Sequence, residues 1–239
     1  MQAAPAAIEI VDLHAWYGES HILHGVNLSL AKGQVLTVLG RNGAGRTTTL
    51  RAIMGLTGSR RGSIKIHGVE TIAMPTHRIA HLGLGYCPEE RGIFASLTAE
   101  ENLRLPPLLA GGGSQPMSEA QIYEMFPNLA ERRHSPGTRL SGGEQQMLAV
   151  ARILRTGADI LLLDEISEGL APVIVQALGR MIRTLKAQGF TIVMVEQNFR
   201  FAAPLADHFI VVEHGEVVAS FAAAELAEKQ ALLDELLSV

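Results

Sequence analysis

The chain has little cysteine, no excess of positive charge and no long hydrophobic run, and each absence excludes a class of protein. A single cysteine, Cys87, in 239 residues rules out an internal disulfide and fits a reducing compartment. The net charge of −4 provides no broad basic field for nucleic acid or anionic lipid. No apolar run approaches the roughly 20 residues that span a bilayer.

The N-terminal residues 1–10, MQAAPAAIEI, contain no Lys or Arg and no long apolar core, so we expect no secretory signal there. If the protein acts at a membrane, another chain must therefore carry the membrane segments. The length and the hydrophobic fraction of 47% predict one α/β domain with a subdomain.

Strand and helix patterns alternate along the chain, which predicts a mainly parallel sheet covered on both faces. We expect a helical region at about 97–154, broken by the loop 110–116, and a C-terminal helix at about 221–239 that packs on its own domain. The remaining predicted strands lie at 8–13, 25–30, 34–40, 62–69, 158–165 and 190–197, and further helices at 47–55 and 171–188.

A glycine-rich segment follows the buried strand 34–40 and opens a helix, which is the arrangement of a P-loop. Its glycines let the backbone turn tightly and direct N–H groups inward, and the start of the helix adds a partial positive charge. We expect this loop to hold the phosphates of ATP and the hydroxyl of Thr47 to bind Mg²⁺. The predicted nucleotide-binding residues are Gly40, Asn42, Gly43, Ala44, Gly45, Arg46, Thr47 and Thr48.

Arg46 stands where the P-loop pattern has Lys. Arginine keeps the positive charge, but its planar fork differs in shape from a compact ammonium group. The alternative to a phosphate site is a glycine-rich turn that precedes a helix and binds nothing.

Two carboxylates, Asp164 and Glu165, end the apolar strand 158–165. The C-terminal ends of strands are where α/β sheets bind ligands. Asp164 is suited to hold Mg²⁺, and Glu165 is suited to activate water as a general base. The alternative is a strand that simply ends in solvated acids.

The segment 140–146, LSGGEQQ, precedes an apolar-periodic helix. Ser141 and Glu144 have the spacing of a capping box. That local role does not account for the adjacent Gly142 and Gly143, which leave backbone N–H groups bare at a helix N-terminus and so favour an anion site.

These motifs, in this order and spacing, resemble the ABC ATPase family, whose signature motif is LSGGQ-like. The resemblance covers nearly the whole chain, and we interpret residues 1–239 as a single ABC ATPase domain. It implies an α/β P-loop NTPase with a RecA-like core, a mainly parallel sheet, an N-terminal antiparallel β subdomain and a helical subdomain at about 97–154. It also implies that Ser141, Gly142, Gly143 and Glu144 face the γ-phosphate bound to a partner subunit.

Other positions match the family residue by residue. The resemblance implies that Tyr17 stacks on adenine, although an ordinary strand aromatic is the alternative. Glu89 takes the position of the Q-loop Gln, a Mg²⁺ contact and a link to the membrane subunit, so the implied metal residues are Thr47, Glu89 and Asp164. Gln197 takes the position of the switch His and joins Glu165 as a catalytic residue. Residues 167–172, SEGLAP, occupy the position of the D-loop.

Glu89 and Gln197, together with SEGLAP and LSGGEQQML, resemble one branch, the LivF-type ATPase subunit of branched-chain amino acid importers. Arg46 and Ile166 depart from that branch as well. The resemblance implies an ATP-hydrolysing subunit for amino acids or amides such as urea, paired with a second copy or a sister ATPase. Integral membrane permease subunits and, indirectly, a substrate-binding protein are its implied partners, with no nucleic acid. Its implied location is cytoplasmic, on the inner face of the cell membrane.

Three rival interpretations remain open at this level. The ATPase of a lipid or lipopolysaccharide exporter would be expected to have Gln in place of Glu89. A soluble ABC ATPase that acts on nucleic acid or ribosomes would usually carry two cassettes or basic patches. A nucleotide-binding regulatory subunit with weak hydrolysis is suggested only by Arg46. The nine histidines are scattered, and no two suggest a ligand pair with Cys or a carboxylate.

Overall fold

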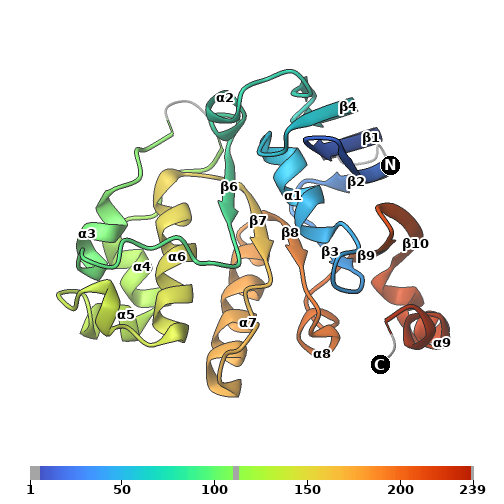
Figure 1. The fold of residues 1–239 in the computed structure, drawn as a ribbon. Helices are drawn as coiled ribbons and strands as arrows, with labels where there is room; N and C mark the ends of the chain where they lie inside the picture. Colours follow the sequence, from blue (N-terminus) through green and yellow to red (C-terminus); the bar gives the residue numbers. More distant parts are fainter. Residues whose placement is uncertain (1–5, 110–112, 238–239) are drawn as a thin grey trace.

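The computed structural model describes residues 6–109 and 113–237, and its strands form two sheets (Figure 1). The smaller sheet is antiparallel and has four strands, in the spatial order β2 (Ser20–Ala31), β1 (Ala6–Tyr17), β4 (Ser59–Ile66) and β5 (Val69–Glu70). The larger has six strands, in the order β10 (Glu216–Ala222), β9 (His208–Glu213), β3 (Val35–Leu39), β8 (Thr191–Val195), β7 (Ile160–Asp164) and β6 (Leu84–Cys87). Only the β9–β10 pair of the larger sheet is antiparallel. The predicted α/β fold with an antiparallel N-terminal sheet and a mainly parallel core is confirmed.

Some helices cover the two faces of the larger sheet, and others lie together on one side of the molecule (Figure 1). Figure 1 shows α3 to α6 gathered on the side away from the antiparallel sheet. The α-helices are α1 (Arg46–Met54), α2 (Thr76–Ala80), α3 (Ala99–Arg104), α4 (Glu119–Met125), α5 (Pro127–Glu131), α6 (Gly142–Thr156), α7 (Pro172–Ala187), α8 (Phe199–Ala202) and α9 (Leu226–Leu237), with 3-10 turns at Gly137–Arg139 and Ala223–Glu225. Among the described residues, no helix combines the length and the hydropathy that a membrane span requires.

The central strands are buried on both faces because each face packs against a different hydrophobic cluster. In β7, Ile160 and Leu162 join the cluster under α1 and the antiparallel sheet, whereas Leu161 and Leu163 join the cluster under α6 and α7. Successive strand residues point to opposite faces, so a strand between two helical layers must be apolar throughout. This arrangement fixes the C-terminal end of β7, where Asp164 emerges.

The C-terminal region differs from the sequence prediction. The strand β10 continues to Ala222, and α9 begins only at Leu226, after a 3-10 turn. The strands β9 and β10 were not anticipated, although His214 and Gly215 turn between them, both with positive φ. The helix packs on its own domain as expected, because Leu233 is buried in a cluster with Phe209 and Phe221.

The region 97–154 is helical in pieces rather than as a continuous run. Between α3 and α6 the chain forms two short helices and a 3-10 turn. Thr98 caps α3 and Ser118 caps α4, each through a capping box. Of the loop expected at 110–116, residues 110–112 lie outside the described residues.

Candidate nucleotide-binding site

The P-loop connects β3 to α1 through residues 40–45. Gly45 is the N-cap of α1, with φ of 107°, and no side chain caps the helix. Residues with a Cβ rarely adopt this φ, and a Cβ at Gly45 would also lie 2.9 Å from Cδ2 of Leu23, so this position favours glycine. A helix start that no side chain caps leaves its N–H groups to a ligand. The local structure therefore suits an anion at the start of α1.

A cavity of about 450 Å³ lies over this loop and is bordered by several segments that are distant in sequence. It brings together most of the side chains that the sequence singled out near the phosphates. The lining residues are Tyr17, Ile22, Asn42, Gly43, Gly45, Arg46, Thr47, Thr48, Glu89, Glu165, Glu168 and Gln197. Gly40 borders a smaller adjoining cavity with Asn42 and Gln197, and Ala44 is buried beneath the loop.

Arg46 and Glu165 form a buried ion pair across this cavity, with 2.7 Å between Nη2 and Oε1. Nη2 of Arg46 also donates to Oδ1 of Asn42 at 3.1 Å. The second carboxylate oxygen of Glu165 accepts from Nε2 of Gln197 at 3.0 Å. Both oxygens of Glu165 are therefore held, one by the P-loop and one by Gln197, two residues beyond the end of β8.

Glu165 occupies the left-handed backbone region, with φ of 48°. This conformation is unfavourable for a residue with a Cβ and marks a position that the surrounding structure imposes. The backbone N–H of Glu165 donates to the carbonyl oxygen of Val195, which ties the strained residue to the end of β8.

Asp164 lies behind this pair and accepts two hydrogen bonds. Oγ1 of Thr47 donates to Oδ1 and the hydroxyl of Tyr86 donates to Oδ2, each at 3.0 Å. Burial raises the pKa of Asp164, while the hydrogen bonds from Thr47 and Tyr86 oppose that shift. The direct contact between Thr47 and Asp164 joins two of the oxygen groups that the sequence assigned to Mg²⁺.

The carboxylates of Glu89, Glu165 and Glu168 form a second oxygen cluster, with one oxygen of each lying within 4.8 Å of the others. The pKa of Glu168 is raised to about 7, chiefly by a hydrogen bond with Glu165 and to a smaller extent by burial. Hard oxygen donors at this density suit Mg²⁺. Glu168 was not among the predicted site residues, although it lies within the 167–172 segment.

The start of α6 has the predicted capping box. The Ser141 hydroxyl accepts from the Glu144 N–H, and the Glu144 carboxylate accepts from the Ser141 N–H. None of the described residues 141–144 lines the cavity over the P-loop. Figure 1 places α6 on the other side of the molecule from α1 and β3. The two glycine-rich segments are therefore separated within one chain.

Comparison with protein families shows which family has this arrangement. The family model of the ABC transporter matches residues 23–168. The chain belongs to the ABC transporter family. It is an ABC-type ATPase, and ATP is the nucleotide that this family binds.

Curated relatives of this ABC ATPase extend over most of both chains. It is 38% identical to the high-affinity branched-chain amino acid transport ATP-binding protein BraG of Pseudomonas aeruginosa, over 85% of this chain and 87% of that one. It is 34% identical to the probable branched-chain amino acid transport ATP-binding protein LivF of Archaeoglobus fulgidus, over 93% and 95%. It is 30% identical to the lipopolysaccharide export system ATP-binding protein LptB of Acidithiobacillus ferridurans, over 89% and 88%.

A solved structure of an ATP-binding subunit of an ABC transporter has the same fold as this ABC ATPase. The TM-score is 0.80 at 28% identity, with 98% of this chain and all of that one covered. The predicted P-loop NTPase fold and the resemblance to the branched-chain amino acid branch are thus both confirmed.

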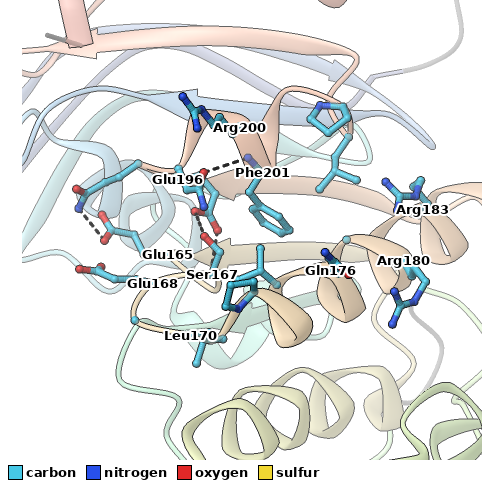
Figure 2. Close-up of a pocket in the computed structure, with 18 residues that line it drawn as sticks. Glu165, Ser167, Glu168, Leu170, Gln176, Arg180, Arg183, Glu196, Arg200 and Phe201 are labelled. Carbon is cyan, nitrogen blue, oxygen red and sulfur yellow. Dashed lines mark hydrogen bonds between the residues drawn. The ribbon is translucent and has the colours of Figure 1, made fainter. Parts of the chain in front are cut away.

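A larger cavity of about 1080 Å³ lies beside Glu165 and Gln197 in this ABC ATPase, between residues 165–170, α7 and α8. Figure 2 shows Glu196 and Ser167 facing each other among the residues that line it. Both the N–H and the hydroxyl of Ser167 donate to the Glu196 carboxylate, at 3.2 and 2.7 Å. Burial raises the pKa of Glu196 to about 7, although the bonds from Ser167 oppose the shift.

Glu196 is a site-region residue that the sequence analysis missed. It precedes Gln197 at the end of the buried strand β8 and is only 1% exposed. A carboxylate next to a candidate catalytic residue at a strand end was the available signal. Its contact joins the segment after β7 to the segment after β8, and these are the two segments that carry Glu165 and Gln197.

Proposed function

We propose that this chain is the ATP-hydrolysing subunit of an ABC importer for branched-chain or other amino acids, or for amides such as urea. The observation that supports ATP hydrolysis is the position of Glu165, whose carboxylate lies between Arg46 of the P-loop and Gln197. The similarity to BraG and LivF over most of both chains supports the importer and its substrate class.

The proposed nucleotide site follows from the cavity over the P-loop. Backbone N–H groups at residues 40–48 hold the phosphates, and Tyr17 at the cavity edge stacks on adenine. Arg46 turns from Glu165 toward the phosphates, because a guanidinium group binds phosphate oxygens in the same forked geometry as a carboxylate.

Thr47, Asp164 and Glu89 are the residues that we propose to hold Mg²⁺. They fit the ion because all three supply oxygen, and Thr47 and Asp164 already lie in contact. Bound Mg²⁺ neutralises charge on the phosphates during transfer. The buried carboxylate of Asp164 would be unfavourable without a cation, as its raised pKa indicates.

Glu165 acts in this proposal as the general base that orients and activates water. Gln197 holds one oxygen of that carboxylate and directs its amide to the γ-phosphate. An amide does not titrate, so this contact adds no pH dependence to hydrolysis.

The separation of residues 141–144 from the cavity over the P-loop supports a dimer. We propose that two chains pair head to tail, so that Ser141, Gly142 and Gly143 of one chain close the site of the other. The partner is a second copy or a sister ATPase. The pair docks on membrane permease subunits at the inner face of the membrane, through the surface beside residues 89–103, where Phe94 is exposed.

The similarity to LptB favours a second candidate, the ATPase of a lipopolysaccharide or lipid exporter. Purification of the tagged chain from its native membrane, followed by mass spectrometry of copurifying proteins, separates the two. The importer requires a polytopic permease, and its ATPase activity in proteoliposomes should rise with a substrate-binding protein loaded with an amino acid or amide. Stimulation by lipid alone would favour the exporter. Absence of any membrane partner would contradict both.

A further inference from the structure

Three histidines and a tryptophan stack on the β1–β2 hairpin, and none of the four lines the cavity over the P-loop. The rings of Trp16 and His21 are nearly parallel, with centroids 4.2 Å apart, and the His24 ring lies 4.0 Å from that of His21. Nothing in the sequence spacing pairs these histidines. The antiparallel register brings them together, because it places His14 opposite His24 and Trp16 opposite His21.

Two ring nitrogens in this cluster face each other. Nδ1 of His14 lies 3.1 Å from Nε2 of His21. With metal–nitrogen bonds of about 2.0–2.1 Å, this separation corresponds to a ligand–metal–ligand angle of about 100°. That angle lies between octahedral and tetrahedral geometry, so the spacing of the two nitrogens suits one ion. The rings must turn to bind it, because the two nitrogens now face each other as partners in a hydrogen bond.

The other nitrogen of His14 has a carboxylate partner. Nε2 of His14 lies 3.2 Å from Oδ1 of Asp12. A hydrogen on Nε2 leaves the lone pair of Nδ1 directed at His21. A carboxylate that orients a histidine in this way is the usual outer partner of a metal-binding imidazole.

The backbone conformation at Asp12 places its carboxylate beside His14. Strand β1 changes register between Ile10 and Leu13, and Asp12 within this irregularity has φ of 49°. Such bulges redirect a side chain, and a positive φ outside glycine marks an imposed conformation. Gly62 permits the bulge, because a Cβ there would lie 2.2 Å from the carbonyl oxygen of Asp12.

We propose that His14 and His21 bind a divalent transition metal ion such as Zn²⁺, with Asp12 as the outer carboxylate. Imidazole nitrogens select ions of this class over Mg²⁺. In the bound form His21 carries its hydrogen on Nδ1, so that Nε2 is free to coordinate. Water fills the remaining positions, and His24 is the nearest further imidazole.

The test is Zn²⁺ titration of the tag-free full chain by calorimetry at pH 7.5, in millimolar Mg²⁺ so that the acidic cluster is occupied. We expect one site with a micromolar dissociation constant. His14→Ala and His21→Phe should each weaken it at least about tenfold, and Asp12→Asn several-fold. His21→Phe retains an aromatic ring against Trp16, so loss of binding cannot be ascribed to loss of the stack.

His77→Ala is the matched control, because His77 and His81 lie about one turn apart at α2, outside this cluster. Binding should survive this change. The electron paramagnetic resonance spectrum of bound Cu²⁺ should show coupling to two imidazole nitrogens, and His14→Ala should remove one. Absence of Zn²⁺ binding, or binding that depends on His77 and not on His14, would overturn the proposal.

Discussion

Nη2 of Arg46 lies 2.7 Å from Oε1 of Glu165, and this contact joins the P-loop to the end of β7 across 119 positions of sequence. Both side chains are almost completely buried. Removing one partner of a buried ion pair leaves an uncompensated charge, which is far less favourable than replacing both. The identity of the residue at position 46 therefore affects both the phosphate site and the proposed base.

The substitution Arg46→Lys tests this coupling. Nη2 of Arg46 makes both hydrogen bonds, to Asn42 and to Glu165, from the far end of a guanidinium group. A lysine ammonium group is compact and sits on a shorter side chain, so it holds Glu165 less closely. We expect ATP turnover to stay unchanged or to rise, by up to about tenfold, because Glu165 is released more readily. Steady-state kinetics at saturating MgATP measures the effect. A large fall would mean that Arg46 has an optimised role of its own.

The substitution Glu165→Gln removes the proposed base while keeping the size of the side chain. We expect turnover to fall at least about 100-fold, while ATP binding remains. Gel filtration in saturating MgATP, with the transporter partner subunits supplied, should then reveal a trapped ATP-bound dimer. The same sample without Mg²⁺ is the control. A chain that stays monomeric in MgATP would argue against the two-chain site.

Tyr17 provides a test of the adenine position. Its side chain is partly exposed and lines the cavity over the P-loop beside Ile22. Because stacking requires the ring and not the hydroxyl, Tyr17→Phe should leave the KM for ATP within about twofold, and Tyr17→Ala should raise it about tenfold. Equal effects of both substitutions would indicate that the hydroxyl, not the ring, is what matters.

Glu196 predicts a pH-dependent stability. Its folded pKa of about 7 lies above the ordinary value of 4.5, chiefly because of burial. Between these two values the folded chain retains a proton that the unfolded chain has lost, so the free energy of unfolding falls as pH rises through that window. Above pH 7 this contribution no longer changes.

Glu196→Gln removes that titration and retains a side-chain oxygen as an acceptor for Ser167. Relative to the unsubstituted chain, the variant should gain roughly 1–3 kcal/mol between pH 5 and pH 8. Urea denaturation at the two pH values measures the gain. Glu196→Ala, which loses both hydrogen bonds to Ser167, is the comparison for a purely structural effect. The prediction is contradicted if the Gln variant and the unsubstituted chain differ in stability by the same amount at both pH values.

Sequence reasoning reached the central strands because their burial on both faces leaves a continuous apolar pattern, as in Ile160–Leu163. It also reached the cap of α6, since Ser141 and Glu144 interact locally. The contacts that it missed join different strands or the segments that follow them. The Ser167–Glu196 pair and the His14–His21 pair depend on how strands are paired or ordered, and a pattern along one segment contains no such information.

The capped start of α6 stays outside the phosphate cavity of its own chain, and this has a genetic consequence where two copies pair. A copy carrying Glu165→Gln damages the cavity on its own P-loop, whereas a copy carrying Ser141→Arg damages the cavity of its neighbour. In a dimer of the two variants, both substitutions affect the same cavity, and the second cavity contains neither. Co-expression of two individually inactive alleles should therefore rescue part of the activity that neither supplies alone.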